Sequence, residues 1–215
     1  MPGAYSSKRN FLFDLDGTLV NSVPAHERSF VETLKALHPA MAENFHYAVY
    51  AGWPTRDVFV ALGFRDPKEL DELTAHKQRL YRESVERGAI EVFPGAMDLL
   101  ERLRKMGHRL FLVTGASRAS TDRVVKITGL IDYFEDIVTA DDAHPGKPAP
   151  EPYLHTMARH GLKAEESIVL EDAASGIESA RSAGLDVILI HGDFQPPSGV
   201  IKVNDFAELV PLLLP

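Results

Sequence analysis

The feature that most constrains the fold is an unbroken run of large apolar residues, Phe11-Leu12-Phe13, which leads directly into the acidic pair of Asp14 and Asp16. An apolar run without polar alternation is typical of a strand that is buried on both faces, as strands of parallel sheets are. Open α/β sheets carry their chemistry at the carboxyl ends of such strands. The stretch therefore predicts a central strand with a functional site at its end, and Asp14 is the candidate nucleophile.

Further apolar runs follow in the second half of the chain and alternate with segments of helical periodicity. Strands are expected at 109–114, 136–139, 167–170, 186–190 and 200–203, and helices at about 99–106, 117–128, 151–160, 175–183 and from Phe206. Because strands that alternate with helices pair in parallel, the predicted fold class is α/β, a doubly wound and mostly parallel sheet.

The residues between the first strand and about Glu91 show only helical patterns. Helices are expected at about 23–38 with Ser22 as N-cap, at 55–62, and from Asp66 to about Arg87. Asp66 followed by Pro67 and Glu69 is typical of a capped helix start. We therefore expect a core domain of residues 1–20 and 91–215, with a small α-helical cap domain of residues 21–90 inserted after the first strand.

The composition excludes several classes of protein. A hydrophobic content of 45% is enough for a packed core, and a net charge of -8 without a Lys/Arg run argues against nucleic acid or an anionic membrane as partner. The chain has no cysteine, which excludes disulfides and thiolate zinc sites. It shows neither a signal-peptide core nor an apolar run near the ~20 residues of a membrane helix. We expect a cytoplasmic protein that is a monomer or a homodimer.

The two acids after the first strand indicate a metal site. Asp14 and Asp16 would repel each other at an apolar strand end unless a cation or a proton neutralised one of them. Carboxylate and carbonyl oxygens are ligands that suit Mg²⁺. The alternative for this pair is a solvated acidic turn. A second acidic pair, Glu171 and Asp172, follows another apolar run.

Two other segments carry groups that can hold an anion. Thr114 ends an apolar strand, and Gly115 and Ala116 can offer backbone N–H groups at a helix start; the alternative is a common turn. Lys147 lies between prolines that stiffen the backbone, so it can neutralise a phosphoryl oxygen and a carboxylate together; the alternative is a salt-bridged loop lysine. No Ser or Thr follows Lys147, which excludes a nucleotide P-loop.

Parallel strands place their carboxyl ends at one edge of the sheet, so these groups can converge there. The converging set is Asp14, Asp16, Thr114, Lys147, Glu171 and Asp172. Several acids with one lysine and one hydroxyl predict a site for Mg²⁺-assisted phosphoryl transfer.

The chain closely resembles, in order and over nearly its whole length, the four motifs of the haloacid dehalogenase superfamily of phosphohydrolases: Phe13-Asp14-Leu15-Asp16-Gly17-Thr18-Leu19, Thr114-Gly115, Gly146-Lys147-Pro148 and Glu171-Asp172. The helical insert resembles the cap of the subfamily that holds phosphoglycolate phosphatases, sugar-phosphate phosphatases and β-phosphoglucomutases. The resemblance implies a Mg²⁺-dependent phosphatase that acts on a small phosphorylated metabolite, such as a sugar phosphate, through an aspartyl phosphate.

The resemblance also implies catalytic roles. Asp14 would attack phosphorus, and Asp16 would protonate the leaving alkoxide and later deprotonate water. Thr114, Gly115 and Ala116 would hold phosphoryl oxygens, while Lys147 would offset charge at the nucleophile. An aspartate at position 16 favours phosphate esters over haloacids, because a haloacid has no leaving alkoxide to protonate.

A metal site is implied in the same way. Mg²⁺ would be held by the side chain of Asp14, the backbone carbonyl of Asp16 and the side chain of Asp172. Glu171 would serve as a further ligand or as a supporting residue.

Substrate choice is expected to depend on the cap. His26 lies where hexose-phosphate members of the subfamily often have a histidine, and the alternative is a surface or packing residue. Arg56 lies in a segment that resembles the cap specificity loop, where it can pair with a second anionic group or a sugar hydroxyl. The alternative is an exposed arginine at a helix start. Arg118, just past the cradle, is equally open.

Three other functions compete with hydrolysis. A β-phosphoglucomutase-like phosphomutase would return the phosphoryl group to sugar, but Thr18 and the lack of a clear second phosphate clamp in the cap favour a hydrolase. A phospho-receiver carries its aspartate on a middle strand of a shorter domain. A non-catalytic binding protein should have lost one of Asp14, Asp16, Lys147 or Asp172, and all four are present.

Overall fold

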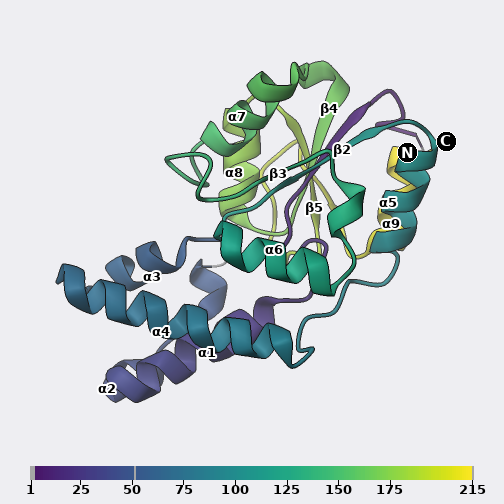
Figure 1. Cartoon of the computed structure of the whole chain (residues 1–215). Helices are drawn as coiled ribbons and strands as arrows, with labels where there is room; N and C mark the ends of the chain where they lie inside the picture. Colours follow the sequence, from purple (N-terminus) through teal and green to yellow (C-terminus); the bar gives the residue numbers. More distant parts are fainter. Residues whose placement is uncertain (1–2, 51, 215) are drawn as a thin grey trace.

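The computed structural model describes residues 3–50 and 52–214 and has an α/β architecture (Figure 1). Its sheet comprises β1 (Asn10–Phe13), β2 (Arg109–Val113), β3 (Asp136–Val138), β4 (Ser167–Glu171), β5 (Asp186–Ile190) and β6 (Ile201–Val203). Within the described residues the strand order is β3-β2-β1-β4-β5-β6, and each pairing is parallel. The predicted fold class is confirmed, while the predicted core limits at residues 1 and 215 lie outside the described residues.

The strand β1 lies at the centre of the sheet, between β2 and β4, where the chain switches from one half of the sheet to the other. Phe13, its last residue, is level with Leu112 of β2 and Leu170 of β4. The residues that follow these three strands therefore emerge side by side, at the place where open α/β sheets bind ligands.

Helices cover both faces of the sheet. One face carries α5 (Ala96–Lys105), α6 (Arg118–Ile127) and α9 (Phe206–Leu213), and the other carries α7 (Glu151–His160) and α8 (Ala174–Ser182). Phe11 and Phe13 are buried in the apolar cluster of the first face, and Leu12 is buried in that of the second. Successive side chains of a strand point to opposite faces, so a strand covered on both sides needs an unbroken apolar run.

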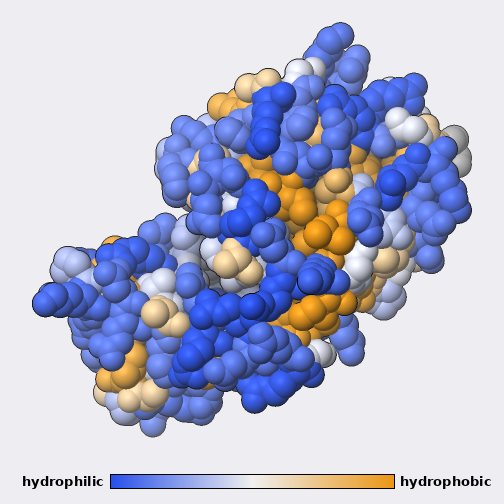
Figure 2. Space-filling model, viewed as in Figure 1, coloured by the Kyte–Doolittle hydropathy of each residue, from blue (hydrophilic) through white to orange (hydrophobic). Residues whose placement is uncertain are grey.

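A helical layer lies below the sheet in Figure 1. It consists of α1 (Val23–Leu37), α2 (Pro39–Ala42), the 3-10 turn η1 (Tyr47–Tyr50), α3 (Thr55–Ala61) and α4 (Pro67–Glu86). Phe30, Phe59 and Leu73 are buried in an apolar cluster of its own, while the surface of α4 in Figure 2 is largely hydrophilic. We propose, as the sequence predicts, that this layer is a cap. None of the described helices is long and apolar enough to cross a membrane.

Two chain segments join the helical layer to the sheet, and they pair with each other. Val20 forms an antiparallel bridge with Val92, and the N–H of Asn21 donates to the carbonyl of Glu91 at 2.8 Å. The entry to the helical layer and the exit from it therefore lie side by side, and the layer is joined to the sheet at one place.

The helix starts show where local signals succeeded and where they failed. Asp66 caps α4 as predicted, because its carboxylate accepts from the N–H of Glu69 at 2.9 Å. Ser22 precedes α1 but makes no capping bond, so its predicted capping role is wrong. Its backbone is already helical, with φ -97° and ψ -12°, whereas a capping side chain needs an extended backbone. The short α2 and η1 were not predicted, because four residues each show no period.

Burial of the central strand predicts a large penalty for truncation there. Leu12→Ala should lower the free energy of unfolding by about 2–5 kcal/mol, because Leu12 is fully buried between sheet and helices. Leu154→Ala on α7 is the control, since Leu154 is 44% exposed and should cost less than about 1 kcal/mol. Urea denaturation of both variants measures the difference, and equal costs would contradict this description of the core.

Candidate active site

The carboxyl ends of the three central strands bring the predicted acids together. Asp14 follows β1 and donates its backbone N–H to the carbonyl of Leu170 at 3.0 Å, while Thr114 follows β2 and Asp172 follows β4. Carboxylate oxygens of Asp14, Glu171 and Asp172 all lie within 4.8 Å of one another. The expected convergence at this edge is thus present in the geometry.

The turn after Asp16 requires glycine. Gly17 has a φ of 88°, and a Cβ at this position would lie 2.0 Å from Oδ2 of Asp172. Thr18 donates its hydroxyl to Oδ1 of the same carboxylate at 3.4 Å. The turn therefore packs directly against the acid that follows β4.

Lys147 is buried among these carboxylates. Its Nζ lies 2.7 Å from Oδ1 of Asp14 and 2.5 Å from Oε1 of Glu171, and it donates to the carbonyl of Val113 at 2.8 Å. Burial favours the neutral amine, but the charges of Asp14 and Glu171 outweigh burial and hold the pKa of Lys147 well above its usual value. The lysine is therefore a fixed cation beside the candidate nucleophile.

Glu171 is already occupied by protein donors. Its Oε1 accepts from Lys147 and from the hydroxyl of the buried Tyr153 at 3.0 Å, and its Oε2 accepts from the backbone N–H groups of Asp172 and Ala173. Tyr153 was missed by the sequence analysis, because an aromatic residue in an amphipathic helix has the pattern of simple core packing.

The donor set and its charge fit Mg²⁺. Burial raises the pKa of Asp14 to about 8, with repulsion from Glu171 adding to the rise and Lys147 opposing it. Burial and the neighbouring Asp14 likewise raise the pKa of Asp172 well above its usual value. One ammonium is thus too little positive charge for three carboxylates, and oxygen ligands suit a hard divalent cation. Asp14 and Asp172 are the side chains that can hold it.

The predicted anion cradle lies next to these acids and against the helical layer. The N–H of Ala116 donates to Oγ1 of Thr114 at 3.1 Å. A Cβ on Gly115 would lie 3.0 Å from the carbonyl oxygen of Gly52, which precedes α3. The cradle therefore needs a small residue where the two layers touch.

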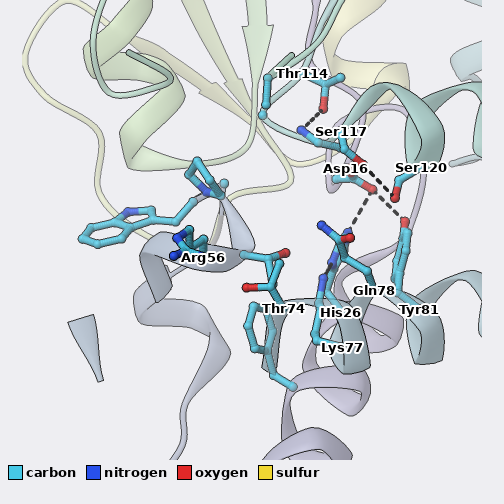
Figure 3. A pocket seen from close by; sticks show the side chains of 18 of the residues that line it. Asp16, His26, Arg56, Thr74, Lys77, Gln78, Tyr81, Thr114, Ser117 and Ser120 are labelled. Carbon is cyan, nitrogen blue, oxygen red and sulfur yellow. Dashed lines mark hydrogen bonds and ion pairs between the residues drawn. The ribbon is translucent and has the colours of Figure 1, made fainter. Parts of the chain in front are cut away.

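Asp16 points toward the helical layer (Figure 3). Its Oδ1 accepts from the hydroxyl of Tyr81 at 3.2 Å and lies 3.3 Å from Nε2 of His26. Nδ1 of His26 lies 2.7 Å from Nζ of Lys77 on α4, and the imidazole ring stacks on Tyr81 with centroids 4.0 Å apart. An ammonium that donates to Nδ1 places the imidazole proton on Nε2, facing Asp16.

Burial sets the charge states in this chain of contacts. It lowers the pKa of Lys77 to about 7, although the charge of Asp16 opposes the shift. Burial and the charge of Lys77 also lower the pKa of His26. For Asp16, burial acts upward but is outweighed by His26 and Lys77, so the pKa falls to about 2.

Lys77 and Tyr81 were not predicted from the sequence. Both lie on the buried face of α4 in line with Leu73, so the available signal was a lysine within an apolar stripe of a predicted helix. A lysine there is usually taken as the edge of the stripe, since its long stem can reach solvent.

The two arginines singled out in the sequence lie in different surroundings. Arg56 borders the cavity and forms an ion pair with Asp71 of α4. Arg118 donates to the carboxylate of Asp142 and to the carbonyl of Ile137, both at 2.6 Å. Arg118 is thus bonded to residues at the end of β3 and just after it. The substrate role of Arg56 stays a prediction.

A cavity of about 190 Å³ lies between the sheet and the helical layer. Asp14, Asp16 and the Thr114–Ala116 cradle border it from the sheet side, and His26 and Lys77 border it from the helical layer. It is smaller than the roughly 300–1,000 Å³ usual for drug-sized ligands, so it suits one small molecule.

The fold is that of an α/β protein whose candidate active site lies between a parallel sheet and a helical layer. A family model described as haloacid dehalogenase-like hydrolase matches residues 11–190. The chain belongs to this family, as its motifs predicted.

Relatives support the same assignment, and a solved structure shares the fold. The chain is 35% identical to hexitol phosphatase A of Escherichia coli over 88% of this chain and 86% of the relative. It is 30% identical to the pyrophosphatase PpaX of Anoxybacillus flavithermus over 80% and 79%, respectively. The crystal structure of CbbY from Rhodobacter sphaeroides in complex with phosphate has a TM-score of 0.79 at 23% identity, covering 94% of this chain and 96% of that one. This last likeness establishes the fold.

The raised pKa of Asp14 predicts that metal binding releases protons. At pH 7 the metal-free site holds at least one proton that a cation displaces, because the pKa values of Asp14 and Asp172 are both raised, so Mg²⁺ binding should release protons. The release should fall as the pH rises through about 8, where Asp14 is already ionised. Calorimetry in buffers of different ionisation enthalpy counts these protons.

Asp14→Asn should reduce the proton release, whereas the exposed control Asp98→Asn on α5 should leave it unchanged. The same release from all three proteins, or none from the wild type, would contradict the proposed ligand set.

Proposed function

We propose that this protein is a Mg²⁺-dependent phosphatase that hydrolyses a small phosphate monoester through an aspartyl phosphate on Asp14. The observation that carries the proposal is the pair of environments at one cavity. Asp14 is held by the buried Lys147 beside Asp172, while Asp16 is held across the cavity by His26 and Tyr81. Two acids in different surroundings can take different roles in one reaction.

The first chemical step forms the covalent intermediate. A carboxylate oxygen of Asp14 attacks phosphorus, the ester P–O bond breaks, and the leaving alkoxide takes a proton from Asp16. The phosphate dianion raises the proton affinity of Asp16, and the Nε2–H of His26, 3.3 Å away, is the donor at hand. Lys77 can then replace the imidazole proton through its contact with Nδ1.

The second step releases phosphate, regenerates the Asp14 carboxylate and leaves Asp16 with one proton, which can serve the next turnover or return to Lys77 through His26. Asp16, again a carboxylate, removes a proton from water that attacks phosphorus, and the bond between phosphorus and the Asp14 oxygen breaks. The N–H of Gly115 and the hydroxyl of Thr114 hold phosphoryl oxygens during both steps, and the N–H of Ala116, predicted for the same role, instead orients the Thr114 hydroxyl by donating to its oxygen. Lys147 offsets the negative charge at Asp14.

The metal and Glu171 have supporting roles. Asp14, Asp172 and the backbone carbonyl of Asp16 would hold Mg²⁺, whose charge would lower the repulsion between carboxylate and phosphate. Glu171 orients Lys147, because both of its oxygens already accept hydrogen bonds from the protein. The sequence allows Glu171 to be either a metal ligand or a residue that supports the site. These hydrogen bonds favour the supporting role.

A sugar phosphate or related polyol phosphate is the proposed substrate class. The hexitol phosphatase similarity and the small cavity support it. Pyrophosphate is the second candidate, favoured by the similarity to PpaX. A phosphomutase would also have to bind a second phosphate, and product analysis with a sugar phosphate and a bisphosphate activator separates it from a hydrolase.

A leaving-group comparison tests the two acids separately. Asp16→Asn should slow hydrolysis of an alkyl phosphate by about 10²–10⁴-fold, because the alkoxide then leaves without a proton. An aryl phosphate whose leaving group needs no proton should still give a burst of one phenol per enzyme. Rapid-quench kinetics with Mg²⁺ measures the burst.

Asp14→Asn should give no burst with either ester, and EDTA should abolish turnover by the wild type. A burst from Asp14→Asn would overturn the nucleophile, and equal losses on both esters in Asp16→Asn would overturn its role as acid.

A further inference from the structure

The α4 side of the cavity, or outer region, is bordered by two neutral polar side chains. Thr74 and Gln78 lie one helical turn apart, so both face the same side. In Figure 3 they lie between Arg56 at one end and Asp16 at the other. Neither position belongs to a motif that the sequence singled out.

Thr74 brings a polar hydroxyl to the border of the cavity. Its Oγ1 is buried and has no hydrogen-bond partner among the described residues. A buried hydroxyl without a partner costs free energy, so such groups usually meet a ligand or water. A ligand hydroxyl in the cavity would satisfy Thr74 directly.

The cations in this region are already engaged. Lys77 is turned toward His26, with 2.7 Å between Nζ and Nδ1. Arg56 forms its ion pair with Asp71, which precedes Thr74 by one turn of α4. A second phosphate entering here would have to compete with the Asp71 carboxylate for the guanidinium.

We propose that this outer region is a subsite for an uncharged, hydroxylated leaving group, in which Thr74 and Gln78 hydrogen-bond the hydroxyls. Asp71 biases the subsite against a second phosphate by holding Arg56. This inference rests on the proposed phosphatase activity and names its substrate class: polyol monophosphates rather than bisphosphates or pyrophosphate.

The chemistry of the two side chains suits this ligand. A hydroxyl both donates and accepts, and so do a threonine hydroxyl and a glutamine amide. A site built to hydrogen-bond substrate hydroxyls also rejects an analogue that lacks them, because its own polar groups then stay unpaired. Selectivity should therefore depend on these two positions.

Matched substrates test the subsite. We compare kcat/KM of the Mg²⁺-loaded full chain for a terminal glucitol monophosphate and for n-hexyl phosphate, which has the same carbon chain without hydroxyls. The wild type should favour the glucitol ester at least about tenfold. Thr74→Val and Gln78→Met should each lower this ratio about fivefold or more, chiefly through KM for the glucitol ester.

The charge at Asp71 is tested by a second ratio. For Asp71→Asn, kcat/KM for a glucitol bisphosphate relative to the monophosphate should rise about threefold at low ionic strength, because Arg56 is released. Glu72→Gln is the matched control, since it removes one exposed charge from the next position of α4 and should leave the ratio unchanged.

Three results would overturn the proposal. The first is a wild type whose kcat/KM does not differ between the hydroxylated ester and n-hexyl phosphate. The second is an equal loss of kcat/KM on both esters in the variants at Thr74 and Gln78, and the third is an unchanged ratio in Asp71→Asn. Each would contradict the subsite but not the phosphatase activity. Folded wild type that releases phosphate from neither monoester would instead overturn the proposed function and the subsite with it. Circular dichroism confirms folding in each case.

Discussion

This site depends on the ion pairs that the buried ammonium of Lys147 forms with Asp14 and Glu171. Nζ of Lys147 lies 2.7 Å from Asp14 and 2.5 Å from Glu171, and all three side chains are almost fully buried. Taking such ions out of water costs several kcal/mol each, which only close pairing and further hydrogen bonds offset. Because Lys147 also binds the carbonyl of Val113, the ends of β1, β2 and β4 are tied together by a single cation.

The surroundings of Asp16, the proposed acid and base, are formed by both layers of the molecule. Asp16 follows the central strand, but its partners His26 and Tyr81 lie on α1 and α4, and Lys77 supports His26 from α4. The partners of Asp16 are therefore complete only when the helical layer meets the sheet. The layer is joined to the sheet at one place, near Val20 and Val92, so the helical layer can close over a substrate. The same closure can exclude water from the cavity and orient Asp16.

The sheet and the convergence of acids at its edge could be predicted because the relevant signals are local. An unbroken apolar run such as Phe11-Leu12-Phe13 fits few structures other than a doubly covered strand, and a parallel sheet then brings the following acids together. The surroundings of Asp16 could not be predicted, because Lys77 meets His26 only through the packing of α4 on α1. Arg118 is engaged by Asp142, a residue that local sequence does not connect with it. Such contacts depend on tertiary geometry.

The central claim is that phosphate passes through Asp14 before it reaches water. The stereochemical course at phosphorus tests it most directly, using a thiophosphate ester made chiral at phosphorus with two oxygen isotopes and hydrolysed in water that carries the third, so that the released thiophosphate is chiral. Transfer first to Asp14 and then to water is two in-line displacements, each with inversion, so the account predicts net retention of configuration. Net inversion would show a single direct attack by water and would contradict the account.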